Sequence, residues 1–382
     1  MGLLVVSTNK DKRNKLKRAI NERRFVMKQQ SDKAQKGEIE FRKKLSQQQI
    51  EGERFFEDEY DAKGIEKILA ERMKKTYDNM VSLKERGIAL SPYLEIGAER
   101  CQRSLVMEND LEVSGAAVDI SYDMLKSCDY YKEAFNKNKV PLRVCCDANN
   151  LPFMSGSIPF VFCYETIHHF PEPNPIVKEI HRVLQPGGHF FFHEEPFKKV
   201  LHINLYNAEK TNSKKPAKST RLRKIKTGFD IFFAKKTCNE TEHDIIENHD
   251  ISLKTWKKTL GLFEEKNINL HSNAITKTID TELFHPKNYS KYLLAYLFGG
   301  EISGICRKAG DPLRKEMPIQ DTLIYPSCSK NGHESKLGQK NSLLYCKECS
   351  NSYPILDGVA FLFSPEKLEE LYPEISKARN TS

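Results

Sequence analysis

Four acidic side chains follow short apolar runs in the middle of the chain, where they could bind a polar ligand together. The runs end at Glu95, Asp119, Asp147 and Glu165. In a sheet of parallel strands such ends meet at one edge, which is where ligands bind. A carboxylate at this edge can accept hydrogen bonds from ribose hydroxyls or from the amino group of an adenine. The pattern therefore predicts a nucleoside site.

The turn after the first run supports that site. Residues 95–98 read Glu-Ile-Gly-Ala, and Gly97 lets the chain turn tightly while a ligand approaches the backbone. Asp119 follows at close to the spacing of about 20 residues that is known for ribose-binding acids. A nicotinamide dinucleotide is the rival ligand, but its fingerprint needs three glycines to admit a pyrophosphate. This loop has one glycine, and Glu99 would repel phosphate.

The elements that must position these residues alternate along the chain. Strands are expected at 92–97, 116–120, 142–147, 160–165 and 189–194, with helices at 103–109 and 176–184. Short strands that alternate with helices predict a mostly parallel, doubly wound α/β sheet with helices on both faces.

The segment from Tyr93 to Pro196 resembles the core of class I S-adenosylmethionine (SAM)-dependent methyltransferases. Four motifs carry the resemblance, namely Leu94-Glu95-Ile96-Gly97, Val118-Asp119-Ile120-Ser121, Asp147-Ala148 with Leu151-Pro152-Phe153, and Leu184-Gln185-Pro186-Gly187-Gly188. The resemblance implies a Rossmann-like sheet of seven strands, SAM as the cofactor, and methyl transfer as the activity. The residues implied to bind SAM are Glu95, Gly97, Ala98, Asp119, Ile120, Asp147, Ala148, Glu165 and Thr166.

The first loop departs from the family at two positions. The family usually has two further glycines there, whereas this chain has Glu99 and Cys101. Their side chains narrow the approach to the ligand, so a catalytically degenerate scaffold subunit is the alternative to an enzyme. SAM carries no phosphate and has a positive sulfonium centre, so an acid-rich loop fits SAM better than it fits a dinucleotide.

Methyl transfer requires a nucleophile aligned behind the methyl group, and a general base helps where the acceptor is a weak acid. The candidate catalytic residues are His168 and His169 after the fourth strand and Glu195 after the fifth, with Tyr164 and Glu194 beside them. Each has an ordinary alternative, because the histidines could shape a loop and Glu195 could cap a turn. We favour His169 as a pocket residue.

The net charge is +9, and basic residues concentrate in residues 8–30 and 198–226. The second segment is predicted to be an insertion after the fifth strand, where the family often recognises its substrate. An anionic methyl acceptor is one interpretation and a solvated loop is the other. The basic contacts would be Lys198, Lys199, Lys214, Lys215, Arg221 and Arg223. We favour a small molecule, glycan or lipid intermediate over RNA, because stacking aromatics are sparse there and no RNA-binding module is recognised.

Near the end of the chain, two cysteines have the spacing of a metal-binding knuckle. With two upstream residues they could hold zinc in a tetrahedral site of three thiolates and one imidazole. The candidate ligands are Cys328, His333, Cys346 and Cys349. Residues 352–359 resemble the zinc-ribbon-like domain that accompanies methyltransferases. That family usually has a further cysteine where this chain has Tyr325, so the fold is predicted and zinc binding is left open.

The domain plan follows from these segments. We expect a basic helical arm at 1–60, loosely packed, then the methyltransferase domain at 61–306, a linker at 307–322, the ribbon-like domain at 323–365 and a tail at 366–382. No apolar run reaches the length of a signal-peptide core or a membrane-spanning helix. The ten cysteines lack a disulfide framework, so the sequence predicts a cytoplasmic protein with reduced thiols.

Overall fold

The computed structural model describes seven stretches of the chain and a few short pieces. The stretches are residues 29–47, 62–198, 251–272, 299–312, 317–326, 334–349 and 351–380. The pieces are residues 206–207, 234–235 and 278–281 and the single residues 293, 297 and 328. Within these residues, no helix has the length and apolarity that crossing a membrane requires.

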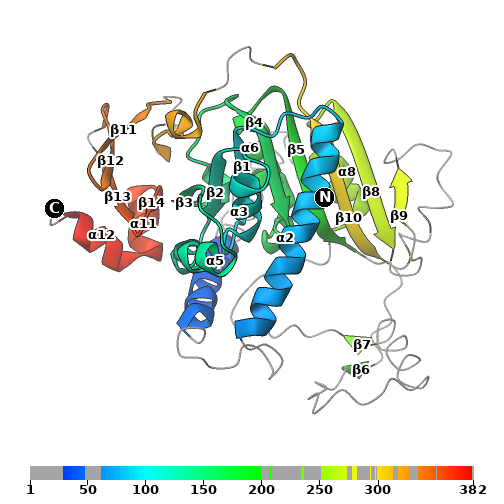
Figure 1. Ribbon diagram of the computed structural model, residues 1–382, viewed down its shortest axis with the longest axis horizontal. Helices are drawn as coiled ribbons and strands as arrows, with labels where there is room; N and C mark the ends of the chain where they lie inside the picture. The colour runs from blue at the N-terminus through cyan, green and yellow to red at the C-terminus, as the bar shows by residue number, and fades with distance from the viewer. Residues whose placement is uncertain are drawn as a thin grey trace, which may run out of the picture.

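Strands that run side by side form one large mixed sheet (Figure 1). Their bounds are β1 Tyr93–Ile96, β2 Gly115–Asp119, β3 Leu142–Cys145, β4 Ile158–Tyr164, β5 Leu184–Phe197, β8 Glu265–Ser272, β9 Thr278–Thr281, β10 Gly300–Arg307, β11 Leu337–Lys340, β12 Leu343–Cys346, β13 Ser352–Leu356 and β14 Val359–Phe361. The order across the sheet is β11-β12-β13-β14-β3-β2-β1-β4-β5-β10-β8-β9. A separate short pair joins β6 Tyr206–Asn207 and β7 Ala234–Lys235.

The centre of the sheet confirms the doubly wound α/β prediction. Strands β3, β2, β1, β4 and β5 are parallel neighbours, and β10 and β8 continue antiparallel beyond β5. The sheet has 12 strands, more than the seven predicted, because β9 extends one edge and β11 to β14 extend the other.

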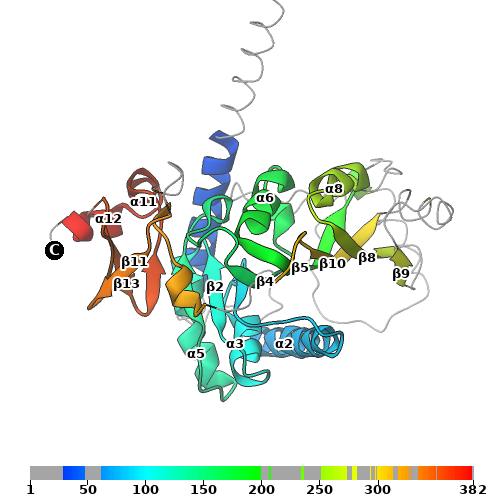
Figure 2. The same cartoon turned by 90° about the horizontal axis from the view of Figure 1, so that it is seen from above.

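Helices cover both faces of the sheet. Their bounds are α2 Ala62–Glu85, α3 Gln102–Asn109, α4 Tyr122–Lys126, α5 Cys128–Ala134, α6 Pro173–Val183, α8 Leu253–Leu260, α11 Pro365–Leu371 and α12 Pro373–Asn380, with short 3₁₀ turns η1 Ala148–Asn150, η2 Ile167–His169 and η5 Ile319–Thr322. A further helix spans residues 29–47. Figure 2 shows α6 and α8 on one face and α2, α3 and α5 on the opposite face.

Two hydrophobic cores fill the space between the sheet and these helices. Successive side chains of a strand point to opposite faces, so β4 contributes to both cores. Val161 and Cys163 pack in the core that includes α6 and α8, while Phe160 and Phe162 pack in the core that includes α2 and α3. Burial on both faces explains why β4 reads as a continuous apolar run rather than an alternating one.

The two ends of the chain pack more closely on the centre than the sequence predicts. In place of a loosely packed arm, the helix of residues 29–47 buries Ile39, Phe41 and Leu45; residues 1–28 and 48–61 lie outside the described part. The C-terminal unit, which comprises the described residues between 323 and 380, does not stand apart as a separate domain, because β14 pairs in parallel with β3 and so extends the main sheet.

Candidate functional site

A cavity of about 310 Å³ lies at the carboxyl edge of β1 to β4, and its volume is in the range of small-molecule sites. Its wall contains these residues predicted from the sequence: Gly97, Asp119, Ile120, Asp147, Ala148, Glu165, Thr166, His168 and His169. The convergence of strand ends therefore does bring most of the predicted residues together. Glu95, Ala98 and Glu195 are the members of the predicted cofactor and catalytic sets that are not in the wall.

The loop after β1 keeps the shape of a glycine-rich turn although it has one glycine. Gly97 has a φ of 69°, and a side chain there would overlap the hydroxyl of Thr166. Glu99 and Cys101 have φ values of 49° and 59°, which is the left-handed region that glycine favours. The Cys101 side chain is fully buried and does not line the cavity. The departures from the family thus preserve the backbone path of the loop.

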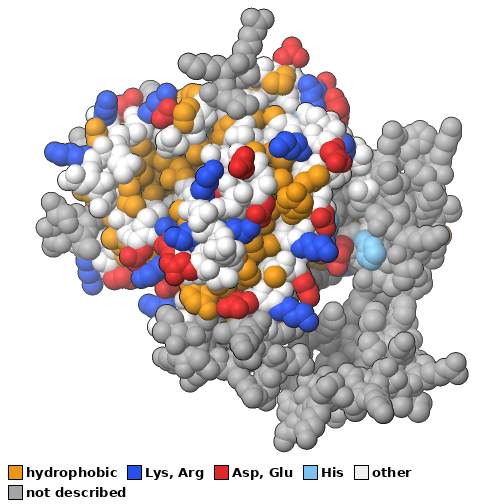
Figure 3. Space-filling view, viewed as in Figure 1, with side chains coloured by type: hydrophobic (Ala, Val, Ile, Leu, Met, Phe, Trp, Pro, Cys, Tyr) orange, Lys and Arg blue, Asp and Glu red, His pale blue; other side chains and the backbone are white. Residues whose placement is uncertain are grey.

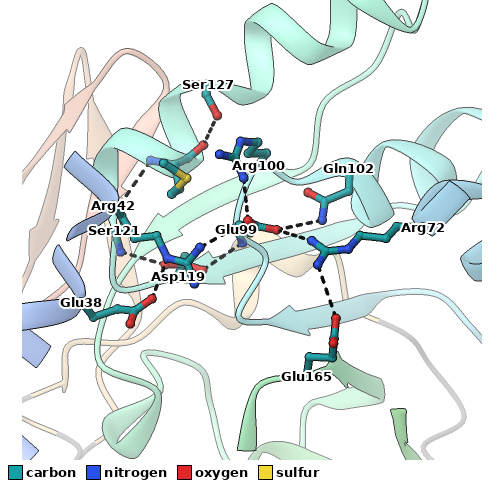
Figure 4. Close-up of polar contacts among 11 residues, drawn as sticks. Glu38, Arg42, Arg72, Glu99, Arg100, Gln102, Asp119, Ser121, Ser127 and Glu165 are labelled. Atoms are coloured by element: carbon teal, nitrogen blue, oxygen red, sulfur yellow. Dashed lines mark hydrogen bonds and ion pairs between the residues drawn. The ribbon is translucent and has the colours of Figure 1, made fainter. Parts of the chain in front are cut away.

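The carboxylate of Glu99 is compensated by three arginines (Figure 4). Its oxygens lie 2.6 Å from Arg100, 3.1 Å from Arg72 and 3.4 Å from Arg42. Burial opposes ionisation, but these guanidinium groups hold the pKa of Glu99 well below its usual range. The charge that would repel an anionic ligand is therefore neutralised within the protein.

Asp119 ends β2 with both oxygens fixed by the backbone. One oxygen accepts the N–H of Glu99 at 2.9 Å, and the other accepts the N–H of Ser121 at 2.8 Å. Because each carboxylate oxygen has two acceptor positions, one on each remains for a ligand. Burial raises the pKa of Asp119 to about 6, although these two hydrogen bonds favour the ionised form.

The helix of residues 29–47 forms the outer wall of the cavity. It contributes Ser31, Ala34, Gln35, Glu38 and Arg42. Two ion pairs connect it to α11 of the C-terminal unit: Asp32 with Lys367 at 2.6 Å, and Lys36 with Glu370 at 3.2 Å. This wall comes from outside the segment that carries the sequence motifs.

Three polar atoms of the cavity residues are buried without a hydrogen-bond partner among the described residues. They are Oε1 of Gln35, Nε of Arg103 and Nδ1 of His169. A buried polar atom that lacks a partner costs about 1–3 kcal/mol. A ligand with several polar groups would supply partners for these atoms, so this combination of donors and acceptors fits a nucleoside such as that of SAM.

Glu95 faces away from the cavity wall. Its carboxylate accepts a hydrogen bond from the hydroxyl of Ser104 on α3, and burial raises its pKa to about 7 although Arg103 opposes this. Ala98 is fully buried. Neither Glu95 nor Ala98 lines the cavity, so the predicted contact of these two residues with SAM is not supported.

Glu195 is buried behind the loop that follows β4. Its carboxylate accepts the N–H groups of Thr166 at 2.8 Å, Ile167 at 2.9 Å and His168 at 3.2 Å. It also lies 3.0 Å from Nδ1 of His168. With none of its side chain exposed, Glu195 holds this loop in place and does not face a substrate, which corrects its predicted catalytic role.

The remaining catalytic candidates differ in their surroundings. Burial, and then the neighbouring His168, lowers the pKa of His169 to about 4, so this imidazole is neutral at neutral pH. The hydroxyl of Tyr164 accepts a hydrogen bond from Asn79, and burial raises its pKa to about 12. Glu194 is paired with Lys75 of α2 and does not line the cavity. His169 is therefore the candidate with an available ring nitrogen in the cavity.

Two arginines that line the cavity could not be predicted from the sequence. Arg72 of α2 bridges Glu99 and Glu165, the latter at 3.5 Å (Figure 4). Arg103 of α3 places its guanidinium 4.5 Å from the ring centre of Tyr164. Neither arginine belongs to a motif, and among many charged helix residues no spacing singles them out.

The predicted metal ligands are described only in part. The sulfur atoms of Cys328, Cys346 and Cys349 lie within 4.8 Å of one another, while His333 lies outside the described residues. Tyr325 is buried, with its ring 5.1 Å from that of Tyr353, and its hydroxyl accepts a hydrogen bond from Asn351. Tyr325 therefore fills a core position and does not replace a ligand.

The predicted basic contacts fall mostly outside the described residues. These are Lys199, Lys214, Lys215, Arg221 and Arg223. Over the described part of the face in Figure 3, Lys and Arg side chains are mixed with Asp and Glu side chains. The described part of that face has no broad basic surface of the kind that attracts nucleic acid.

Residues 94–192 match a protein-family model described as a methyltransferase domain. This segment is similar to methyltransferase domains. The matched segment includes the four strand ends and most of the cavity residues, so the methyltransferase resemblance predicted from the sequence is confirmed for this segment. Helix 29–47 and the C-terminal unit lie outside it.

Two relatives from Arabidopsis thaliana are named as uncharacterized chloroplastic methyltransferases. At1g78140 is 40% identical over 101 residues, which cover 24% of this chain and 28% of that protein. At2g41040 is 35% identical over 77 residues, which cover 19% of this chain and 22% of that protein. The chain thus spans about a quarter of the length of these relatives.

Two of the solved structures similar to this chain have sequence identities below 20%. The PH0226 protein from Pyrococcus horikoshii has 18% identity and a TM-score of 0.38, covering 63% of this chain and 90% of that chain. Phosphoethanolamine N-methyltransferase 2 from Haemonchus contortus, in complex with SAM, has 14% identity and a TM-score of 0.35, covering 61% and 53%. At these scores the assignment of the methyltransferase domain rests on the family match and the relatives alone.

Proposed function

We propose that this protein transfers a methyl group from SAM to an acceptor bound at the carboxyl edge of β1 to β4. The observation that carries the proposal is the cavity in which Asp119, Asp147 and Thr166 meet beside the turn at Gly97. These residues come from three successive strand ends and the first loop, all within the matched domain.

SAM supplies a methyl group that is already activated on its sulfonium sulfur. The protein's own contribution is therefore binding and orientation. Asp119 would accept the ribose hydroxyls at its two remaining acceptor positions, and Asp147 with Ala148 would flank the adenine. The helix of residues 29–47 would cover the ligand and limit the access of water.

His169 has a further role in this proposal. Its imidazole is neutral at neutral pH, and its Nδ1 has no partner among the described residues. A neutral imidazole in the cavity can form a hydrogen bond with a hydroxyl or amine of the methyl acceptor and so orient that group. With a pKa of about 4, His169 is a weak base and would not hold a transferred proton at neutral pH.

Calorimetric titration of the full chain with SAM and with S-adenosylhomocysteine tests the proposal. We expect saturable binding of both ligands with one site per chain. A folded sample that binds neither ligand would favour the alternative of a scaffold subunit with a methyltransferase fold. An RNA acceptor would in addition require RNA binding that weakens steeply with salt.

The acceptor and the compartment remain predictions. A small molecule, glycan or lipid intermediate, anionic if the basic insertion contacts it, is the acceptor class that we propose. The sequence favours the cytoplasm, whereas both relatives carry the word chloroplastic in their names. Localisation of the full-length protein in its own cells distinguishes these compartments.

We further propose that Cys328, Cys346 and Cys349 bind one zinc ion. Tetrahedral zinc with bonds of about 2.3 Å to sulfur places its sulfurs about 3.8 Å apart, and the three thiols lie within 4.8 Å of one another. His333 is the fourth ligand predicted from the sequence.

Metal analysis tests this zinc site. The purified full chain should contain about one zinc per molecule, and Cys346→Ser or Cys349→Ser should lose most of it. Cys306→Ser, which alters a buried thiol of β10 outside the cluster, is the matched control and should retain the metal. Equal zinc content in all four proteins would disprove the assignment.

A further inference from the structure

Tyr372, between α11 and α12 of the C-terminal unit, reaches the loop that follows β2. Its hydroxyl donates a hydrogen bond to the carbonyl of Ile120 at 2.7 Å and accepts the N–H of Tyr122 at 3.0 Å. Its ring packs against Phe361 and Phe363, with ring centres 5.4 Å and 5.9 Å away. The side chain is buried, so both hydrogen bonds are shielded from water.

This loop belongs to the cofactor cavity. Asp119 and Ile120 line the cavity, and Ser121 donates its N–H to the Asp119 carboxylate at 2.8 Å. Tyr372 bonds to the residues on either side of Ser121. Its hydroxyl therefore fixes the backbone that aims the Asp119 carboxylate.

A second contact from the same unit is weaker. Asp357 accepts a hydrogen bond from the hydroxyl of Tyr122 and pairs with Lys126 at 2.8 Å. About half of the Asp357 and Lys126 side chains is exposed, and exposed ion pairs contribute little. Of these two contacts, the buried hydroxyl of Tyr372 therefore constrains the loop more strongly.

We propose that Tyr372 is a positioning residue of the cofactor site, which orders residues 120–122 so that Asp119 and Ile120 receive the adenosine half of SAM. The inference rests on the proposed function, because it takes SAM as the ligand of the cavity. It makes the C-terminal unit, which lies outside the matched domain, a part of the cofactor site.

The test is Tyr372→Phe in the full chain, which keeps the ring packing and removes the hydroxyl. SAM affinity, measured by calorimetry, should fall about tenfold, because the N–H of Tyr122 loses its partner and the carbonyl of Ile120 keeps only the weak thiol donor of Cys145 at 3.3 Å. Amide hydrogen exchange should become faster in residues 119–123, and the melting temperature should fall by a few degrees.

The matched control is Tyr325→Phe. It removes another buried hydroxyl of the C-terminal unit, one that bonds to Asn351 and not to the loop, so SAM affinity should stay unchanged. In an Asp119→Asn background, Tyr372→Phe should cause little further loss of affinity, since both changes act on the same carboxylate.

The outcomes separate the inference from the proposed function. If the unaltered protein does not bind SAM, the proposed function fails and the inference fails with it. If the unaltered protein binds SAM and Tyr372→Phe binds it equally well, the inference alone is overturned. Equal losses in Tyr372→Phe and Tyr325→Phe would also overturn it, because they would indicate general destabilisation.

Discussion

Replacing Asp119 with alanine should weaken SAM binding by on the order of 100-fold or more. Each hydrogen bond from a ribose hydroxyl to a carboxylate contributes roughly 1.5–3 kcal/mol, and 1.4 kcal/mol corresponds to a factor of ten. The carboxylate is already oriented by the N–H groups of Glu99 and Ser121, so little ordering is left for the ligand to induce. Calorimetry with SAM measures the loss.

Two variants separate binding from folding. Asp119→Asn keeps the shape and one acceptor oxygen, so we expect an affinity and a melting temperature between those of the unaltered protein and Asp119→Ala. Asp110→Ala removes a carboxylate that pairs with Lys137 outside the cavity, and SAM affinity should not change. Unaltered SAM binding in Asp119→Ala would show that this carboxylate does not hold the ribose.

The same carboxylate predicts a pH dependence. Burial raises the pKa of Asp119 to about 6 from its usual 3.8, so below that pH the unliganded protein holds a proton that SAM binding must release. SAM affinity should therefore be constant above pH 7 and fall about tenfold for each unit below 6. In Asp119→Asn this dependence should flatten, and any step that persists near pH 7 would report Glu95, whose pKa burial raises to about 7.

The centre of the fold and much of the cavity could be predicted because their signals are local. Buried parallel strands read as short apolar runs, and their ends must converge at one edge. Asp119, Asp147 and Thr166 are found in the cavity for that reason. Gly97 could be identified because the tight turn beside Thr166 leaves no room for a side chain.

The rest depends on contacts between distant segments. Glu95 has the residue type of a ligand contact, but its side chain bonds to Ser104. In a strand that is buried on both faces, the sequence does not show which face of the sheet each side chain occupies. The helix of residues 29–47 has few apolar anchors, and its place over the cavity depends on pairs such as Arg42 with Glu99. No local pattern encodes a pair separated by 57 positions.

The C-terminal unit illustrates the same limit. Its cysteines and its resemblance predict a small β-rich unit, yet the pairing of β14 with β3 joins two strands far apart in the chain. An edge strand presents unpaired backbone groups to any partner strand. Without β14, strand β3 would lie at the edge of the parallel strands, and no local pattern in the sequence identifies the segment that pairs with it.

Replacing Glu195 with alanine should destabilise the protein by at least about 3 kcal/mol. The N–H groups of Thr166, Ile167 and His168 would lose their acceptor in a buried setting, at about 1–3 kcal/mol for each. That total is a large part of the stability of a typical domain. Chemical denaturation measures it, with Glu301→Ala, at an exposed position of the neighbouring strand β10, expected to stay within about 0.5 kcal/mol.

The pattern of effects decides between the two roles of Glu195. If it holds the loop, then Glu195→Ala should lower stability and SAM affinity together, because Thr166 and His168 both line the cavity. Glu195→Gln, which keeps one carbonyl oxygen for these donors, should recover part of both. A catalytic role would instead leave stability and SAM affinity intact while turnover collapses. Because the carboxylate is enclosed by three backbone donors and a histidine, we expect the first pattern.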